Sequence, residues 1–82
     1  MPTNNSHRYS AHEQEIMKKM GLRVRQLREA SSLSQEKLAE LAHVHRTYIS
    51  TIERGQQNIS LTILIRLADV LGVSLATLFE DT

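Results

Sequence analysis

Three consecutive residues, Arg46, Thr47 and Tyr48, carry side chains suited to binding nucleic acid. A guanidinium can donate two hydrogen bonds to one guanine, and hydroxyl groups can bond to base edges or phosphates. This chemistry requires the three residues to open a helix whose end enters a major groove. They are therefore candidates for DNA contact, provided that the neighbouring sequence builds and orients such a helix.

The residues around Arg46 predict two short helices joined by a tight turn. Residues 35–54 place apolar side chains on one face of each helix: Leu38, Ala39, Ala42, Ile49 and Ile52. Val44 lies in the turn, and the small Ala39 suits two helices that cross steeply. Ser34 is the expected N-cap of the first helix, and Gly55 is expected to close the second. This is the spacing of a helix-turn-helix motif.

The rest of the chain predicts three more helices around this pair. Over residues 13–30 the apolar residues repeat at helical spacing: Ile16, Met20, Val24 and Leu27. Ser60 is the expected N-cap of a fourth helix that stops at Gly72, and Ser74 caps a short fifth helix. Residues 1–12 show no apolar periodicity and predict a mobile tail. The expected fold class is all-α, with five helices and no strands in one domain over residues 13–82.

Length and composition restrict the class of protein. A chain of 82 residues can hold one small hydrophobic core. It contains no cysteine, so it has no disulfide framework or thiolate metal site, and a cytoplasmic location is expected. No apolar run is long enough to span a membrane, and the first residues do not resemble a signal peptide. We expect no cofactor and no small-molecule ligand.

The net charge of +1 conceals an asymmetry along the chain. Residues 1–28 carry six basic and two acidic side chains, whereas the remainder carries four basic and seven acidic ones. Basic residues are thus concentrated in the first predicted helix and at the start of the second helix of the motif, which suits a surface that faces DNA. The alternative is that residues 18–28 simply form the solvated side of an amphipathic helix.

The fourth predicted helix has apolar residues on two sides. One face carries Leu61, Leu64, Ile65, Ala68 and Leu71, and the opposite face carries Ile63, Leu67 and Val70. A surface helix in so small a domain needs one apolar face, so the second face must meet another helix or a partner chain. The hypothesis is a homodimer with an interface made by Ile63, Leu67, Val70, Leu78 and Phe79. The alternative is that this helix is central in a five-helix core.

Three segments carry a specific resemblance to a known family: LSQEKLAELA, HRTYISTIERG and NISLTILIRLADVLGVSLATLF. Together they resemble the Cro/phage-repressor (XRE) family of helix-turn-helix proteins, over about residues 20–79. Within that family, HRTYIS, IERG and NISL are most similar to controller proteins of restriction–modification systems. The resemblance implies a lambda-repressor-like domain that regulates transcription as a homodimer and binds an inverted-repeat operator in double-stranded DNA.

The resemblance also implies roles for individual residues. Base edges would be contacted by Arg46, Thr47 and Thr51. The phosphate backbone would be contacted by Gln35, Tyr48, Ser50 and Asn58. A structural ion pair would join Arg28 and Glu53. Outside this context, Thr47, Tyr48 and Ser50 are equally consistent with ordinary solvated helix residues.

One residue departs from the family pattern. His43 stands where the turn usually has glycine, at a position expected to need a positive φ. Histidine tolerates that conformation better than bulky or β-branched residues do, so we expect mild strain and an intact fold. His43 and His45 also have the spacing of a metal pair, but cysteine and nearby acidic ligands are missing, and no metal site is predicted.

Other functions fit the sequence less well. An enzyme is not expected, because the chain has no glycine-rich phosphate loop, nucleophile motif or paired-carboxylate cleft. A protein-interaction module would use the same two helices but would bind DNA weakly, with a flat salt dependence. A prophage repressor or an antitoxin would need a further segment, and the only spare sequence is the predicted tail. These comparisons favour the controller interpretation.

Overall fold

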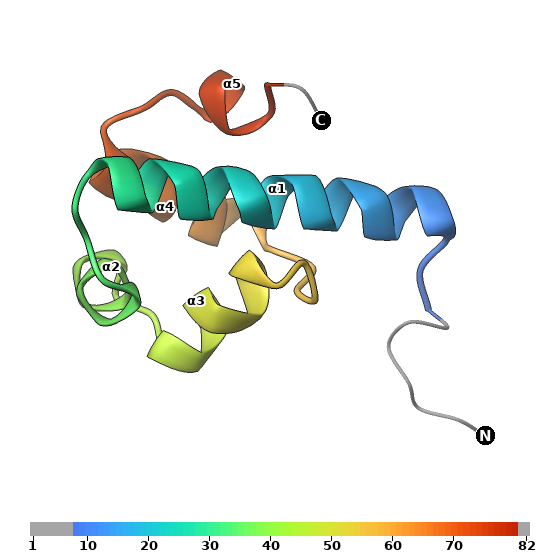
Figure 1. Cartoon of the computed structure of the whole chain (residues 1–82), viewed down its shortest axis with the longest axis horizontal. Coiled ribbons are helices and arrows are strands. Elements are labelled where there is room, and N and C mark those ends of the chain that lie inside the picture. Colours follow the sequence, from blue (N-terminus) through green and yellow to red (C-terminus); the bar gives the residue numbers. More distant parts are fainter. Residues whose placement is uncertain (1–7, 81–82) are drawn as a thin grey trace.

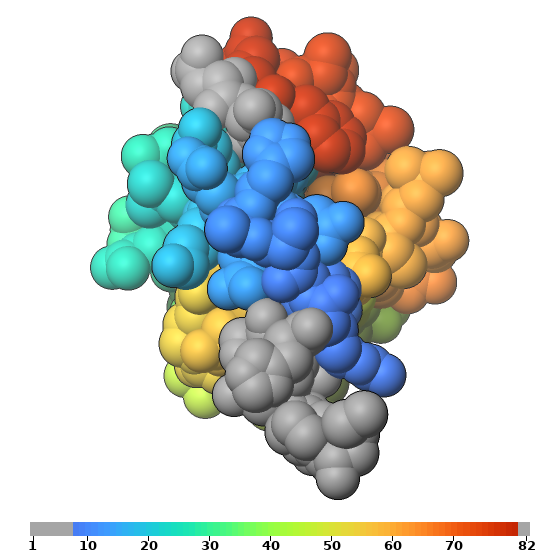
Figure 2. All heavy atoms as spheres, turned by 90° about the vertical axis from the view of Figure 1, so that its right-hand side faces the viewer, coloured from blue at the N-terminus to red at the C-terminus, as the bar shows by residue number. Residues whose placement is uncertain are grey.

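The computed structural model describes residues 8–80, and within that range the chain forms helices and no strands. The helices are α1 (Ala11–Ala30), α2 (Gln35–Ala42), α3 (Arg46–Glu53), α4 (Leu61–Leu71) and α5 (Leu75–Leu78). In Figure 1, α1 crosses the molecule, with α2 and α3 below it, α5 above it and α4 behind it. Viewed from the start of α1, the end of α3 (yellow) and α5 (red) lie on opposite sides of this helix (Figure 2). The predicted all-α fold of five helices is confirmed.

Serine caps and left-handed glycines set most helix boundaries where they were predicted. The hydroxyls of Ser34, Ser60 and Ser74 each accept a hydrogen bond from the backbone N–H three residues later. Gly72 ends α4 with φ of 70°, and Gly55 follows the end of α3 with φ of 73°. The three serine bonds satisfy backbone donors that the first turn of a helix would otherwise leave unpaired.

The start of α1 corrects the prediction of a tail over residues 1–12. Ser10 Oγ accepts a bond from the Glu13 backbone N–H at 3.0 Å, and Glu13 Oε1 accepts one from the Ser10 N–H at 2.9 Å. This reciprocal pair is a capping box, and α1 therefore begins at Ala11. The part of the predicted tail over residues 1–7 lies outside the described residues.

The core lies between α1 and the other four helices. Its buried apolar residues are Met20, Val24, Leu38, Ala39, Ala42, Ile49, Ile52, Leu64, Leu67, Ala68, Leu71 and Leu78. Leu67 and Leu78 are fully buried inside the single chain, so their assignment to a dimer interface was wrong. The apolar arc of α4 is one continuous surface whose centre meets the core, rather than two opposed faces. Ile63 and Val70 form one edge of that arc and pack partly against the core.

A glycine brings α1 directly against α3. A Cβ atom built on Gly21 would collide with the backbone carbonyl oxygen of Ile52. Only glycine allows the two helices to approach this closely. The sequence analysis did not single out this residue, although it determines how α3 is seated on the domain.

Candidate nucleic-acid interface

One side of α3 is anchored in the core and the other faces outward. Ile49 and Ile52 are buried, whereas Arg46 and Thr47 are exposed. Tyr48 is half-buried and packs against the core, so its ring lies at the side of the helix. The apolar spacing of α3 therefore presents the start of the helix to solvent, as a helix that enters a groove requires.

Two histidines shape the approach to α3. His43 ends α2 in the left-handed conformation, with φ of 58° and ψ of 45°, and the predicted positive φ is confirmed. His45 is the N-cap of α3, and its Nδ1 accepts a hydrogen bond from the Thr47 backbone N–H at 3.1 Å. The ring of His45 thus has a structural role in orienting the first turn of the helix. Among residues 8–80, no three His, Cys, Asp or Glu side chains group as a metal site.

The predicted ion pair between Arg28 and Glu53 is present. Arg28 Nε donates to Glu53 Oε2 at 2.6 Å, and a second guanidinium nitrogen donates to Oε1 at 3.0 Å. The side chains are only 12% and 4% exposed, respectively, and Arg28 also donates to the Leu33 carbonyl at 2.8 Å. The hydrogen bond to Glu53 raises the pKa of Arg28, against the opposing effect of burial. This bidentate pair ties α1 to the end of α3.

Gln35 belongs to the same network. Its Nε2 donates to Glu53 Oε1 at 3.0 Å, which holds the side chain at the start of α2. One amide hydrogen remains available to donate to an outside acceptor. The backbone N–H groups of the first turn of α2 lie beside it and are natural partners for an anion. Gln35 is therefore placed as a phosphate contact requires, although its orientation is set by Glu53.

Two other predicted contacts already have partners within the chain. Thr51 Oγ1 donates to the Tyr48 carbonyl at 2.9 Å and lies 3.1 Å from Gln57 Oε1. Ser50 Oγ accepts a bond from Arg54 at 2.6 Å. Arg54 and Gln57 were missed by the sequence analysis. The i, i+4 spacing of Ser50 and Arg54 was a signal from which the bond between these two residues could have been predicted.

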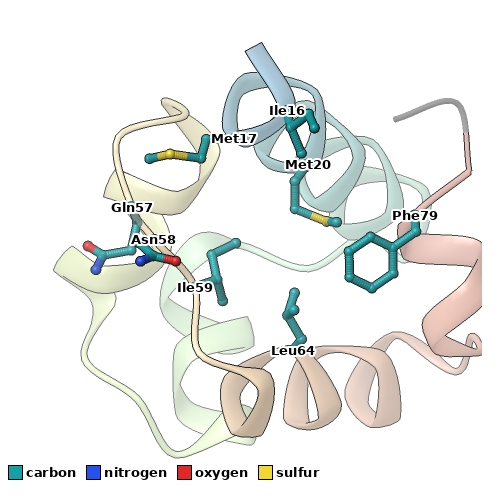
Figure 3. Close-up of a pocket in the computed structure, with 8 residues that line it drawn as sticks. All are labelled: Ile16, Met17, Met20, Gln57, Asn58, Ile59, Leu64 and Phe79. Atoms are coloured by element: carbon teal, nitrogen blue, oxygen red, sulfur yellow. The ribbon is translucent and has the colours of Figure 1, made fainter. Parts of the chain in front are cut away.

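Asn58 lies apart from α3, in the segment that leads to α4. It is exposed and lines a pocket together with Gln57 and the side chains of Ile59 and Phe79. Figure 3 shows the two amides at one end of this mainly apolar pocket and Phe79 at the other. The structure thus gathers Arg46, Thr47, Ser50 and Thr51 on one helix and places Gln35 and Asn58 on flanking segments.

Arg46 at the start of α3 and Arg54 just after its end lack an ion pair among residues 8–80, as do Lys18 of α1 and Arg66 of α4. Most basic residues of α1 and α2 have a carboxylate partner: Lys19 with Glu15, Arg23 with Glu80, Arg25 with Glu29, Arg28 with Glu53 and Lys37 with Glu40. The charges of Arg46 and Arg54 are therefore available to an outside anion.

Comparison with known proteins gives consistent matches. The family described as helix-turn-helix matches residues 24–78. Control protein C.BamHI of Bacillus amyloliquefaciens is 48% identical over 63 residues, which is 76% of this chain and 78% of that protein. The crystal structure of the restriction–modification controller protein C.AhdI of Aeromonas hydrophila superposes with a TM-score of 0.75 at 44% identity, covering 77% of this chain and 96% of that one.

A further solved structure includes nucleic acid. The master regulator for biofilm formation SinR, crystallised in complex with DNA, superposes with a TM-score of 0.72 at 40% identity. The superposition covers 74% of this chain and 98% of the SinR chain.

Among the helices of residues 8–80, none combines the length and the apolar character that a membrane span needs.

Proposed function

The chain belongs to the helix-turn-helix family, and we propose that it is a sequence-specific DNA-binding transcriptional regulator of the restriction–modification controller type. The family match confirms the resemblance to the Cro/phage-repressor group. The controller assignment is supported by the similarity to control protein C.BamHI and to C.AhdI. A cytoplasmic location follows from this function, because the operator is in the cytoplasm.

The observation that carries the proposal is the state of Arg46. It is exposed at the first position of α3 and forms no ion pair within residues 8–80. A guanidinium in that place can donate two hydrogen bonds to a guanine in the major groove. Thr47 lies beside it, and Thr51 lies one turn further along the helix. Tyr48 and Ser50 on α3, with Gln35 and Asn58 on the flanking segments, supply phosphate contacts that fix the register of the helix.

A homodimer is the second part of the proposal, with a revised interface. Leu61 and Ile65 are one turn apart on α4 and are 63% and 42% exposed. Phe79, just after α5, is 46% exposed and lines the pocket of Figure 3 together with Leu64. These three apolar residues replace Leu67 and Leu78 in the interface and leave Phe79 where it was predicted.

Ile63 and Val70 do not fit the same interface. At 100° per residue around α4, Ile63 and Val70 lie on one edge of the apolar arc, and Leu61 and Ile65 lie on the other edge. A flat contact with one partner helix covers one edge and not both. We therefore assign the interface to the edge that carries Leu61 and Ile65, and we assign Ile63 and Val70 to the boundary of the core.

The test begins with selection of bound sequences from random duplexes. A two-fold dimer should select an inverted repeat whose half-site centres are about 10–11 base pairs apart. Arg46→Ala should weaken binding by about 1–3 kcal/mol and relax the preference at one base pair in each half-site. Arg25→Ala is the matched control, because it removes the same charge from α1, where Arg25 pairs with Glu29.

Two outcomes would contradict the proposal. Weak binding with a flat salt dependence would favour a protein-interaction module, since phosphate contacts release counterions and make affinity fall steeply with salt. Equal binding of the selected site by Arg46→Ala and the parent would refute the assignment of α3 as the recognition helix. Footprinting upstream of the protein's own gene then tests the controller role.

A further inference from the structure

Arg54 is held in a defined position by two neutral groups. One terminal guanidinium nitrogen donates to Ser50 Oγ at 2.6 Å, and Nε donates to Gln56 Oε1 at 3.2 Å. Neither acceptor carries a charge, and Arg54 has no carboxylate partner among the described residues. The side chain is therefore oriented without being neutralised, which is unlike the arrangement at Arg28.

Ser50 retains a donor for an outside group. Its oxygen accepts the bond from Arg54, and no acceptor within residues 8–80 takes its hydroxyl hydrogen. Accepting a bond from a cation polarises the hydroxyl and makes it a better donor. Ser50 and Arg54 lie one turn apart on the exposed side of α3, so the hydroxyl and the guanidinium can converge on one anion.

The distance along α3 indicates which part of DNA this anion belongs to. Arg54 follows Arg46 by eight residues, which is about 12 Å along a helix axis. The major groove is only about 8.5 Å deep. If α3 enters the groove with its N-terminal end foremost, Arg46 reaches the base edges and Arg54 lies at the level of the backbone.

We propose that Ser50 and Arg54 form one phosphate-binding unit, in which Arg54 supplies the charge and Ser50 orients it and donates to the same phosphate. The unit rests on the proposed function and refines it, because it adds Arg54 to the interface and gives Ser50 a role that depends on Arg54. It contributes affinity to every DNA sequence and selects none.

The experiment is a double-mutant cycle on the full chain with the selected operator and an unrelated duplex of equal length. The variants are Ser50→Ala, Arg54→Ala and the two combined, with Arg25→Ala as the charge-matched control, and each is measured over a range of salt concentrations. Arg54→Ala should weaken binding to both duplexes about tenfold or more. It should also lower the slope of log affinity against log salt by about one.

The coupling between the two residues is the sharper result. Because Ser50 acts partly through Arg54, Ser50→Ala should have a smaller effect than Arg54→Ala, and the loss in the combined variant should be smaller than the sum of the two single losses. Both side chains are directed away from the core, so melting temperatures should stay near that of the parent. Arg54→Gln should reproduce the loss in slope.

Three results would overturn the inference. An Arg54→Ala variant with an unchanged salt slope would show that Arg54 does not contact a phosphate. A loss confined to the operator, with relaxed preference at one base pair, would show that Arg54 reads a base. Additive effects would show that Ser50 acts independently. If the parent protein bound no DNA, the proposed function would fail and this inference with it. If the parent binds DNA and one of the three results above is obtained, only the roles assigned to Ser50 and Arg54 are wrong.

Discussion

The outward surfaces of α3 and α4 differ sharply, although the two helices belong to one small core. Outside the core, α3 exposes a guanidinium and hydroxyl-bearing side chains with no large apolar residue among them, whereas α4 exposes the aliphatic chains of Leu61 and Ile65 beside its polar residues Thr62, Arg66 and Asp69. Charged and hydroxyl groups suit a hydrated, anionic partner, and aliphatic groups suit a partner that excludes water. The proposed contacts with DNA and with a second subunit thus fall on different helices of one small domain.

The two helices are also held in the domain by different forces. α3 rests on a backbone contact at Gly21 and on the ion pair of Arg28 and Glu53. α4 is held by burial of Leu64, Leu67 and their neighbours. A polar substitution on the core face of α4 should therefore destabilise the domain far more than one on its outer edge. A larger side chain at Gly21 should displace α3.

The largest effect is expected from a pair of matched substitutions on α4. Leu67→Asp buries a carboxylate with no partner, at a cost of several kcal/mol, and should unfold the domain because such domains are stable by only about 5–15 kcal/mol. Ile65→Asp should leave the monomer folded and separate the proposed dimer. Circular dichroism and sedimentation distinguish these outcomes. Two folded, dimeric variants would contradict both the core and the interface assignments.

Operator binding extends this test. A monomer of Ile65→Asp can occupy one half-site only and loses the effective concentration that its partner provides. Affinity for the inverted repeat should fall by orders of magnitude, while residual binding to unrelated DNA persists. An Ile65→Asp variant that separates into monomers but binds the operator as tightly as the parent would show that dimerisation is not needed for recognition.

A smaller effect is expected where α1 meets α3. Gly21→Ala places a methyl group against the Ile52 carbonyl and should cost about 1–3 kcal/mol, which outweighs the better helix propensity of alanine. Melting temperature and operator affinity should both fall, since α3 must shift. Gly72→Ala is the control for binding: its Cβ would meet no atom within 4 Å, so operator affinity should stay unchanged, although its φ of 70° makes alanine strained and should lower the melting temperature. Unchanged melting of Gly21→Ala would mean that the helices separate easily.

The smallest effect concerns the turn before α3. His43→Gly should stabilise the fold by up to about 1 kcal/mol, because glycine removes the steric cost of a left-handed residue. Ser32→Gly provides a parallel case, since Ser32 also has φ of 58°. Thermal unfolding measures both variants. A clear drop in melting temperature for His43→Gly alone would indicate that its side chain makes a stabilising contact.

Local signals in the sequence predicted most of the fold. The caps at Ser34, Ser60 and Ser74 and the left-handed His43 depend on a few neighbouring residues, so their positions can be inferred without knowing the packing. The capping box of Ser10 and Glu13 is equally local, but it was overlooked because the preceding residues lack periodicity.

Features that depend on packing were not predictable from spacing. The apolar arc of α4 spans more than half of the helix, and its pattern does not say which part meets the other helices. Leu67 was therefore placed at the surface although it is fully buried. The contact of Gly21 with Ile52 depends on how α1 crosses α3, which a single-helix pattern does not encode. The pattern placed Arg46, Thr47, Ser50 and Thr51 on one helix, as the structure has them, but the partners of Ser50 and Thr51 within the chain required coordinates.

The close packing of α3 on α1 helps to fix the distance between the two α3 helices of the proposed dimer. The contact at Gly21 leaves no slack between the two helices, so α3 cannot slide to reach a displaced half-site. The separation and rotation of the two α3 helices in the proposed dimer are then set by the subunit interface alone. Each base pair advances the duplex by about 3.4 Å. A shift of a few ångströms between the two subunits, at the edge formed by Leu61 and Ile65, would therefore make the dimer bind an operator with a different half-site spacing.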